Sequence, residues 1–192
     1  GIRDFWLSRG LGDVYKRQFL SLCLTGAILF AMLAACGKTE EFEAPVGMKL
    51  ASDTAVVDYC LFVPESWVVD LSTGVTSAYH SIADPSSLTV NVYGVDASIP
   101  DAETYFKTYE KTFADVFGDM QNVASSNLLL DGNNAMQYEY SASFGGTNYS
   151  FLQVICLKNG FAYVLTYTSS ADNFERHIED VQAAVGAFRF IA

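Results

Sequence analysis

One stretch near the C-terminus constrains the fold more than any other part of the chain: YSFLQVICLKNGFAYVLTYTSS, residues 149–170. Two runs rich in β-branched and aromatic residues flank Asn159-Gly160, and an Asn-Gly pair in that setting is a strong signal for a β-hairpin. A looser turn, FGGT, occupies residues 144–147. Residues 135–169 are therefore predicted to form a three-stranded antiparallel meander, which the turn at Asp131-Gly132 leads into.

Two other segments have helical periodicity. From residue 101 to residue 117 the apolar side chains fall on about a third of the helix circumference, and Glu103 and Lys107 form a favourable i,i+4 pair on the opposite side. Pro100 and Asp101 are signals for the start of this helix. A second amphipathic helix is predicted to begin with Ser170 as its cap and to end at Gly186. The apolar stripes are Ala102, Tyr105, Phe106, Tyr109, Phe113, Val116 and Phe117 in the first helix, and Phe174, Ile178, Val181 and Val185 in the second.

The segments before the first helix are strand-like. Residues 56–63 are β-branched and aromatic, and Pro64 ends that strand because it has no N–H to donate. Trp67, just beyond the turn, is predicted to fill one end of a core. Apolar residues alternate with polar ones in residues 86–94, SSLTVNVYG, as in a half-buried strand. With a short final strand in AFRFIA, the fold class is α+β: a central antiparallel sheet with flanking helices.

The N-terminal region contains 17 residues without a charge, Phe19–Ala35, followed by Cys36. The sequence Leu-Ala-Ala-Cys that closes this run resembles the lipobox of bacterial lipoproteins, in which the cysteine is acylated and becomes the new N-terminus. Cys36 is therefore predicted to be lipidated, and acyl chains on it would hold the protein in the bacterial cell membrane, outside the cytoplasm. The alternative is an uncleaved anchor helix, because the run is intermediate in length between a signal peptide and a membrane span.

The remaining N-terminal boundaries follow from this prediction. Residues 1–18 have no usable periodicity and resemble translated sequencing adaptor, although an irregular natural arm is the alternative. Residues 19–35 are predicted to be the signal peptide and residues 36–47 a charged tether. Residues 48–192 are predicted to be a single domain.

Charge and cysteine content exclude several classes of function. The chain has 22 acidic and 11 basic residues and a formal net charge of −11. Such a surface repels nucleic acid, so no nucleic-acid partner is expected, whereas it attracts cations or basic partners. Cys60 and Cys156 lie in apolar runs and are expected either as small buried side chains or as a disulfide. The absence of a C-x-x-C motif argues against a zinc cage or a thioredoxin-type site.

The order of the predicted elements resembles that of the PsbP-like superfamily, which includes PsbP, DcrB-like proteins and many small bacterial lipoproteins. The residues that carry the resemblance are Phe62, Pro64, Ser66, Trp67, Gly132, Ala135, Tyr163, Thr166 and Phe188 to Phe190. The resemblance covers residues 48–192 and implies an α-β-α sandwich built on a central antiparallel sheet. It implies no catalytic residues, because the matching positions are structural in that superfamily.

A search for catalytic or metal-binding patterns finds none with a specific spacing. The motifs of zinc proteases, serine hydrolases, nucleotide-binding loops and dinucleotide-binding folds are all missing. His177, with Asp180 three residues later, and His80, with Asp84 four residues later, are expected to be boundary histidines with a water or carboxylate partner. No catalytic residue, metal ligand or cofactor is therefore predicted, and the protein is not expected to be an enzyme.

Two functional hypotheses follow. The first is a non-enzymatic binding or assembly module that contacts an envelope protein or a glycan through exposed aromatic residues of the sheet. Tyr138 and Tyr140, or Phe161, Tyr163 and Tyr167, would form that surface if one sheet face is open, and would be core residues otherwise. The alternative is an extracytoplasmic binder of a small ligand or cation, which needs a pocket where carboxylates converge.

Overall fold

The structure is a computed structural model that describes residues 42–72, 74–117 and 120–191. The predicted leader, signal peptide and Cys36 lie outside these residues. Among the described helices, none is long and apolar enough to cross a membrane. The compact unit begins at Phe42, which packs in a small cluster with Cys60, Phe62 and Ala187. The last residues of the predicted tether are thus in contact with the domain.

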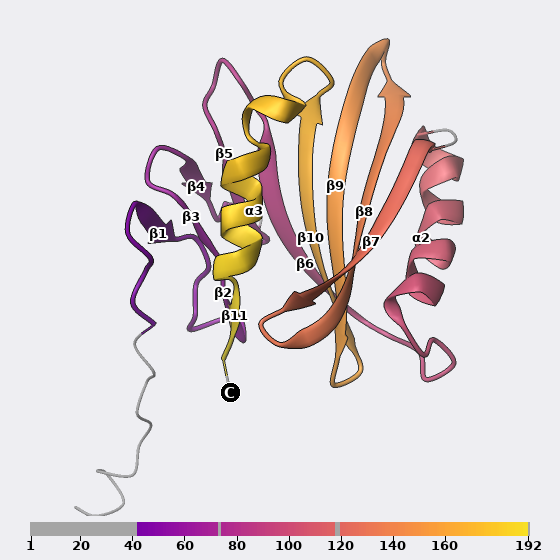
Figure 1. The fold of residues 1–192 in the computed structure, drawn as a ribbon, viewed down its shortest axis with the longest axis horizontal. Coiled ribbons are helices and arrows are strands. Elements are labelled where there is room, and N and C mark those ends of the chain that lie inside the picture. Colours follow the sequence, from indigo (N-terminus) through magenta and orange to yellow (C-terminus); the bar gives the residue numbers. More distant parts are fainter. Residues whose placement is uncertain (1–41, 73, 118–119, 192) are drawn as a thin grey trace, which may run out of the picture. The chain divides into compact units, whose positions relative to one another are not determined.

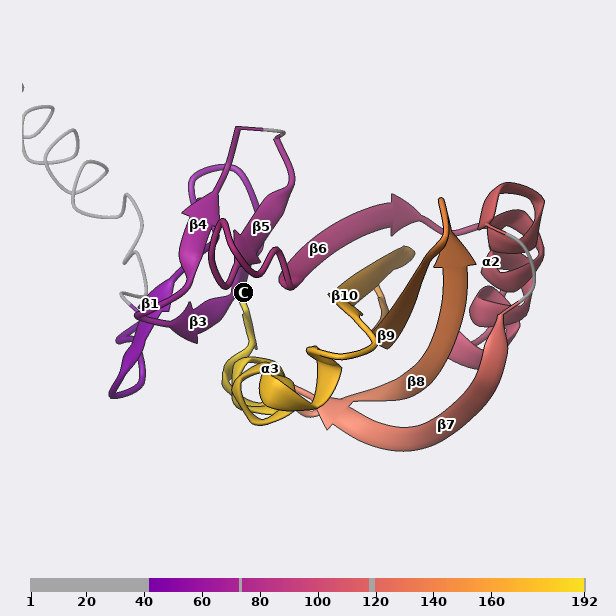
Figure 2. The same ribbon diagram turned by 90° about the horizontal axis from the view of Figure 1, so that it is seen from above.

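A seven-stranded antiparallel sheet organises the domain (Figure 1). In spatial order its strands are β4 (Val68–Asp70), β5 (Thr76–Tyr79), β6 (Ser87–Gly94), β10 (Phe161–Ser170), β9 (Thr147–Lys158), β8 (Asn133–Phe144) and β7 (Gln121–Leu130). Two small antiparallel pairs complete it: β1 (Met48–Leu50) with β3 (Phe62–Pro64), and β2 (Tyr59–Cys60) with β11 (Arg189–Phe190). Seen from above, β7 and β8 are strongly curved (Figure 2).

The two longer helices pack on opposite faces of this sheet. Leu152 and Val154 of β9 belong to the core that includes α3 (Ile178–Ala187), whereas Ile155 belongs to the cluster under α2 (Ala102–Phe117). Because successive side chains of a strand point to opposite faces, the two helices must lie on different sides. The predicted α+β class, with a central antiparallel sheet and flanking helices, is confirmed.

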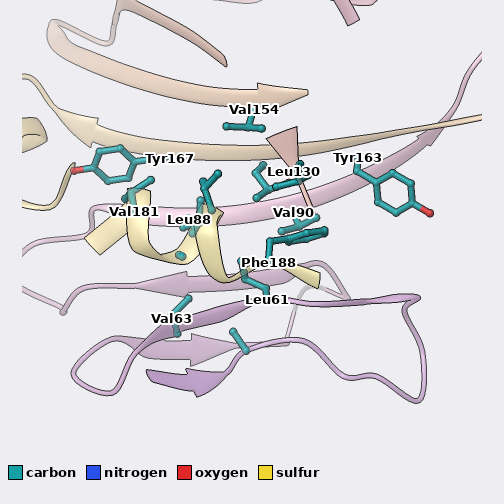
Figure 3. Close-up of a cluster of buried hydrophobic side chains, with 14 of the residues drawn as sticks. Leu61, Val63, Leu88, Val90, Leu130, Val154, Tyr163, Tyr167, Val181 and Phe188 are labelled. Atoms are coloured by element: carbon teal, nitrogen blue, oxygen red, sulfur yellow. The ribbon is translucent and has the colours of Figure 1, made fainter. Parts of the chain in front are cut away.

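The face beneath α3 carries the main core (Figure 3). It joins alternate residues of β6, β9 and β10 to Val181 and Phe188 from α3 and the residue after it. Val63 of β3 and Leu61, which lies between β2 and β3, close it from the other side. Trp67 is 1% exposed in this core, as predicted for a residue that fills one end.

The turns predicted at Asp131-Gly132 and Asn159-Gly160 are confirmed. Asp131-Gly132 and Asn159-Gly160 both adopt positive φ, at 46° and 75° and at 52° and 81°, as the tight hairpins between β7, β8, β9 and β10 require. The predicted meander is formed by β8, β9 and β10. Asp101 Oδ1 accepts a hydrogen bond of 2.8 Å from the Thr104 amide and so caps α2.

Two local expectations need correction. Ser170 is not a helix cap, because β10 continues through it; a 3₁₀ turn (η1, Phe174–Arg176) follows, and α3 begins after His177. The predicted helix therefore starts later than its apolar stripe suggests. Cys60 and Cys156 are both buried and free, so the disulfide alternative is not realised.

Candidate functional site

Helix α2 covers only part of its sheet face. It packs on β8 and β9, where the Phe106 ring stacks on Tyr138 with centroids 3.6 Å apart and planes within 4°. Phe113 meets Tyr140 edge-on at 5.6 Å, a favourable aromatic geometry. The two strands further along the same face, β6 and β10, present half-buried polar residues instead: Ser87, Thr89, Asn91, Thr166 and Thr168.

A groove of about 360 Å³ lies where the covered and uncovered halves meet. Its polar side comes from β6 and β10 and its aromatic side from α2 and the β8–β9 hairpin. The lining residues are Thr89, Asn91, Tyr109, Phe113, Ala142, Phe144, Tyr149, Phe151, Thr166 and Thr168. None of them is charged, although the chain carries a net charge of −11. We refer to this set of residues as the aromatic groove.

Buried polar atoms next to the groove have no hydrogen-bond partner among the described residues. The Gln153 side chain is 1% exposed; its amide nitrogen donates to Thr166 Oγ1 at 3.2 Å, but its Oε1 atom accepts no bond. Tyr138 lies directly across the strand pair from Gln153, and its hydroxyl is likewise buried without a partner. Buried polar groups are usually satisfied, so the polar chemistry on this side of the sheet is incomplete.

The tyrosines expected at an open sheet face are core residues. Tyr138 and Tyr140 are 4% and 3% exposed beneath α2, and Tyr163 and Tyr167 are 2% and 0% exposed on the α3 face. The hypothesis that these side chains form the contact surface is therefore wrong. Helix α2 covers Tyr138 and Tyr140, while Tyr163 packs against Tyr59 and Phe190 and Tyr167 packs against Phe174. Phe161, at the end of β10, is 47% exposed.

The aromatic residues that remain accessible are others. Phe144 is 56% exposed, and Tyr109 and Tyr149 are half-buried at the groove. Sequence reasoning missed the polar side of the groove, although it had a signal: Thr89 and Asn91 occupy alternate positions of the half-buried strand β6.

The structure brings together two histidines that lie far apart in the sequence. His177 Nε2 lies 2.8 Å from Asp84 Oδ2, so its carboxylate partner comes from the β5–β6 loop rather than from its own helix. His80 Nδ1 lies 3.9 Å from the same oxygen, and the two imidazole rings are 4.2 Å apart. Asp180, which follows His177 by three residues, instead accepts a bond from Trp67 Nε1 at 3.2 Å.

The polar groups around Asp84 are not arranged for nucleophilic catalysis. Ser86 donates to Asp84 Oδ1 at 2.6 Å, and His177 contacts the other carboxylate oxygen. A serine nucleophile needs the histidine next to its hydroxyl, whereas here the carboxylate lies between them, and Ser86 is only 2% exposed. Burial also raises the pKa of the Cys60 and Cys156 thiols, which disfavours the reactive thiolate.

Comparison with known proteins identifies the fold. No family model and no curated protein sequence match the chain. The solution structure of cyanobacterial PsbP (CyanoP) from Synechocystis sp. PCC 6803 matches with a TM-score of 0.57 at 16% identity, over 81% of this chain and 96% of that chain. At this identity the likeness shows the fold alone: the domain has a PsbP-like fold, as the order of elements predicted.

Two further solved structures are more distant. PA94 from Pseudomonas aeruginosa, a protein of unknown function, has a TM-score of 0.45 at 13% identity and covers 71% of this chain and 92% of its own. LpqN of Mycobacterium tuberculosis, described as involved in cell envelope biogenesis, has a TM-score of 0.44 at 13% identity and covers 79% and 83%.

Proposed function

We propose that this chain of PsbP-like fold is a membrane-anchored, extracytoplasmic lipoprotein whose domain binds an envelope protein and catalyses no reaction of its own. The observation that carries the proposal is the aromatic groove, an uncharged surface on a strongly acidic chain. Aromatic side chains, tyrosine above all, are enriched at the energetic centres of protein interfaces. Phe144 and Tyr149 supply that chemistry at the open end of the groove.

The polar side of the groove fits a polypeptide partner. Thr166 and Thr168 of β10 and Thr89 and Asn91 of β6 present hydroxyl and amide groups beside the aromatic rings. Such groups donate and accept hydrogen bonds without a net charge, so a peptide segment finds partners for its backbone while its apolar side chains contact Phe144 and Tyr149. A neutral glycan is the other ligand that this chemistry accommodates, and the experiment below separates the two.

The absence of turnover is part of the proposal. Within the described residues, the serine, histidine and aspartate that lie together have an order unsuited to nucleophile activation. The described residues that line the groove include no titratable acid or base apart from tyrosine. A binding role needs none, because affinity comes from desolvation of the rings and from hydrogen bonds.

The membrane anchor is tested by substitution of Cys36. We expect Cys36→Ser to leave an uncut precursor that takes up no labelled palmitate, because the thioether cannot form without the thiol. Cys23→Ser is the matched control, since Cys23 lies within the apolar run, and it should be labelled and cleaved normally. Normal labelling of Cys36→Ser would overturn the anchor.

The binding role is tested by photo-crosslinking in cells. A photoreactive residue replaces Tyr149 or Phe144 in the groove. The control position is Phe161, an exposed aromatic residue on the other face of the sheet. We expect protein adducts from Tyr149 and Phe144 but not from Phe161. Adducts of equal yield from all three positions would contradict a partner at the groove. Adducts whose size changes on treatment with glycosidase but not with protease would show a glycan partner and contradict a protein partner.

The alternative of a carboxylate-based ligand site has less support. A hollow of about 630 Å³ at the start of α2 includes Asp101 and Glu103. Asp101 is engaged as the helix cap, and Glu103 Oε1 accepts a bond of 2.8 Å from Lys107. Both carboxylates are thus already engaged within the helix, one as its cap and one in a surface ion pair.

A further inference from the structure

The geometry points to a transition-metal site, of the kind that Zn²⁺ occupies, formed by His80, Asp84 and His177. One ligand atom from each residue lies within 4.8 Å of those from the other two. The site is separate from the aromatic groove and does not depend on the proposed partner.

The backbone around the site positions the ligands from two elements far apart in sequence. His80 follows β5 directly, and its amide donates to the Ser86 carbonyl at 2.8 Å, which closes the loop that holds Asp84. Within this loop the Asp84 amide donates to Ser81 Oγ at 3.1 Å. His177 is the residue that precedes α3, and it lies 93 positions beyond Asp84 in the sequence. The histidines thus meet only in the folded chain.

The donor set suits a borderline metal ion. Two neutral imidazoles and one carboxylate are the ligands that Zn²⁺ and other first-row transition metals accept, and a three-residue set leaves a coordination position for water or a partner group. Ligand atoms around tetrahedral Zn²⁺ are separated by about 3.4 Å at the usual bond lengths. The two separations from Asp84 Oδ2, 2.8 Å to His177 and 3.9 Å to His80, lie on either side of that value.

The carboxylate is oriented for this role. Asp84 Oδ1 accepts hydrogen bonds from the Ser86 amide and hydroxyl, at 3.2 and 2.6 Å, which leaves Oδ2 directed at the histidines. Metal-bound carboxylates are commonly fixed by hydrogen bonds of this type. An aspartate carboxylate is ionised at neutral pH, so this ligand carries a negative charge.

His80 provides the observation that a purely structural role leaves unexplained. The Asp84–His177 hydrogen bond ties the loop to α3 and would do so without His80. The Nδ1 atom of His80 is buried, however, and has no hydrogen-bond partner in the part of the chain that the structure describes, because 3.9 Å to Asp84 is too long for one. A buried ring nitrogen that faces a carboxylate and a second imidazole is a ready ligand for a metal ion.

Trp67 gives the site an internal reporter. Its indole ring meets both imidazoles edge-on, with centroids 6.3 Å from His80 and 5.9 Å from His177. The chain has two tryptophans, so Trp6→Phe leaves Trp67 as the only one. A paramagnetic ion such as Co²⁺ quenches indole fluorescence at this distance, which localises binding to the site.

The test uses the full chain in detergent micelles, carrying Trp6→Phe and titrated with Zn²⁺ by calorimetry and with Co²⁺ by Trp67 fluorescence. We expect one Zn²⁺ per chain and quenching by Co²⁺. His80→Ala should weaken Zn²⁺ binding by about tenfold or more, because it removes a ligand. Without metal it should melt within a few degrees of the parent chain, because the Asp84–His177 bond remains. Glu179→Gln, an exposed carboxylate two residues after His177, is the matched control and should bind Zn²⁺ within roughly threefold of the parent chain.

Either of two results would overturn the site. One is a Zn²⁺ affinity that is unchanged in His80→Ala. The other is Trp67 emission that does not respond to saturating Co²⁺, which would place any bound metal elsewhere on the chain.

Discussion

The two faces of the sheet differ in how completely they are covered. On the α3 face the buried tyrosines have partners for their hydroxyls: Tyr59 donates to Thr76 Oγ1 at 2.8 Å, Tyr163 to Asp58 Oδ2 at 2.6 Å, and Tyr167 to the Phe174 carbonyl at 3.0 Å. On the α2 face the Tyr138 hydroxyl and Gln153 Oε1 are buried without partners in the described residues. The tyrosine hydroxyls of the α3 face are thus satisfied by the fold itself, whereas the α2 face keeps polar capacity beside an open groove.

This difference separates stability from binding within one domain. The α3 face receives side chains from α3, from the small N-terminal strands and from the chain end, so it forms the main core. The α2 face has a single helix, whose apolar stripe spans only about a third of its circumference and covers mainly β8 and β9. Substitutions on the two faces should therefore have different consequences, in the order of size given below.

The largest effect is expected from Trp67→Ala on the α3 side. Trp67 is 1% exposed, and truncation of a buried aromatic residue costs about 3–5 kcal/mol in the free energy of unfolding. We expect residues 42–192 to fold when produced alone and the variant to be unfolded or barely folded at 37 °C. Urea denaturation measures the free energy of unfolding of the parent domain and of the variant. A variant that melts within a few degrees of the parent would show that this end of the core is not needed.

The next effect concerns the hydrogen bond between Asp84 and His177 at the edge of the α3 face. Because the pKa of Asp84 is lowered in the folded state, its contribution to stability is complete above the unfolded-state pKa and is lost as the pH falls toward the folded-state value. In EDTA at pH 7, Asp84→Asn should lower the free energy of unfolding by about 1–2 kcal/mol, because a hydrogen-bonded charge is lost. At pH 3 the gap between the two proteins should narrow. A gap that widens toward low pH would reverse the sign of this argument.

A smaller effect distinguishes the hydroxyls of the two faces. Tyr167→Phe removes the hydroxyl bond to the Phe174 carbonyl, which keeps only the longer bond of 3.4 Å from the His177 amide, and should cost about 1 kcal/mol. Tyr138→Phe removes a hydroxyl that has no partner among the described residues and should change the free energy of unfolding by less than about 0.5 kcal/mol, or increase it. Equal costs for the two substitutions, measured by urea denaturation, would show that the faces are equally satisfied.

Much of the fold could be predicted from local signals. The hairpin at Asn159-Gly160 needs positive φ at both residues, and this pair adopts it readily, so the turn is encoded at that position. The stripe of α2 likewise predicts its buried side, where Phe106 and Phe113 are 4% and 6% exposed. The apolar pattern predicts too early a start for the helix after Ser170, because pairing with β9 extends β10 through Ser170 and this residue cannot act as a cap.

The candidate sites depended on long-range contacts that the sequence does not reveal. Strand alternation predicts that Tyr138 and Tyr140 share a face, but whether a helix covers that face depends on where α2 returns to the sheet. His80 and His177 come together only if the β5–β6 loop reaches the start of α3. In this contact Asp84 meets His177, which lies 93 residues later in the sequence. Spacing rules describe ligands within one element, and for that reason each histidine was matched with a carboxylate near it in sequence.

The smallest effect on stability, and the largest on binding, is expected from Phe144→Ser in the aromatic groove. Phe144 is 56% exposed at the end of β8, so the substitution should change the free energy of unfolding by less than about 0.5 kcal/mol. It removes, however, the most exposed aromatic ring of the groove, and such a ring at the centre of an interface contributes about 2 kcal/mol or more to binding. Crosslinks from a photoreactive residue at position 149 should therefore become markedly weaker in this variant, whereas Phe161→Ser, which removes a ring that is 47% exposed on the other face of the sheet, should leave them unchanged. If Phe144→Ser destabilises the domain as much as a core substitution does, the ring serves the fold, and the contrast between a satisfied face and an open one fails at the groove.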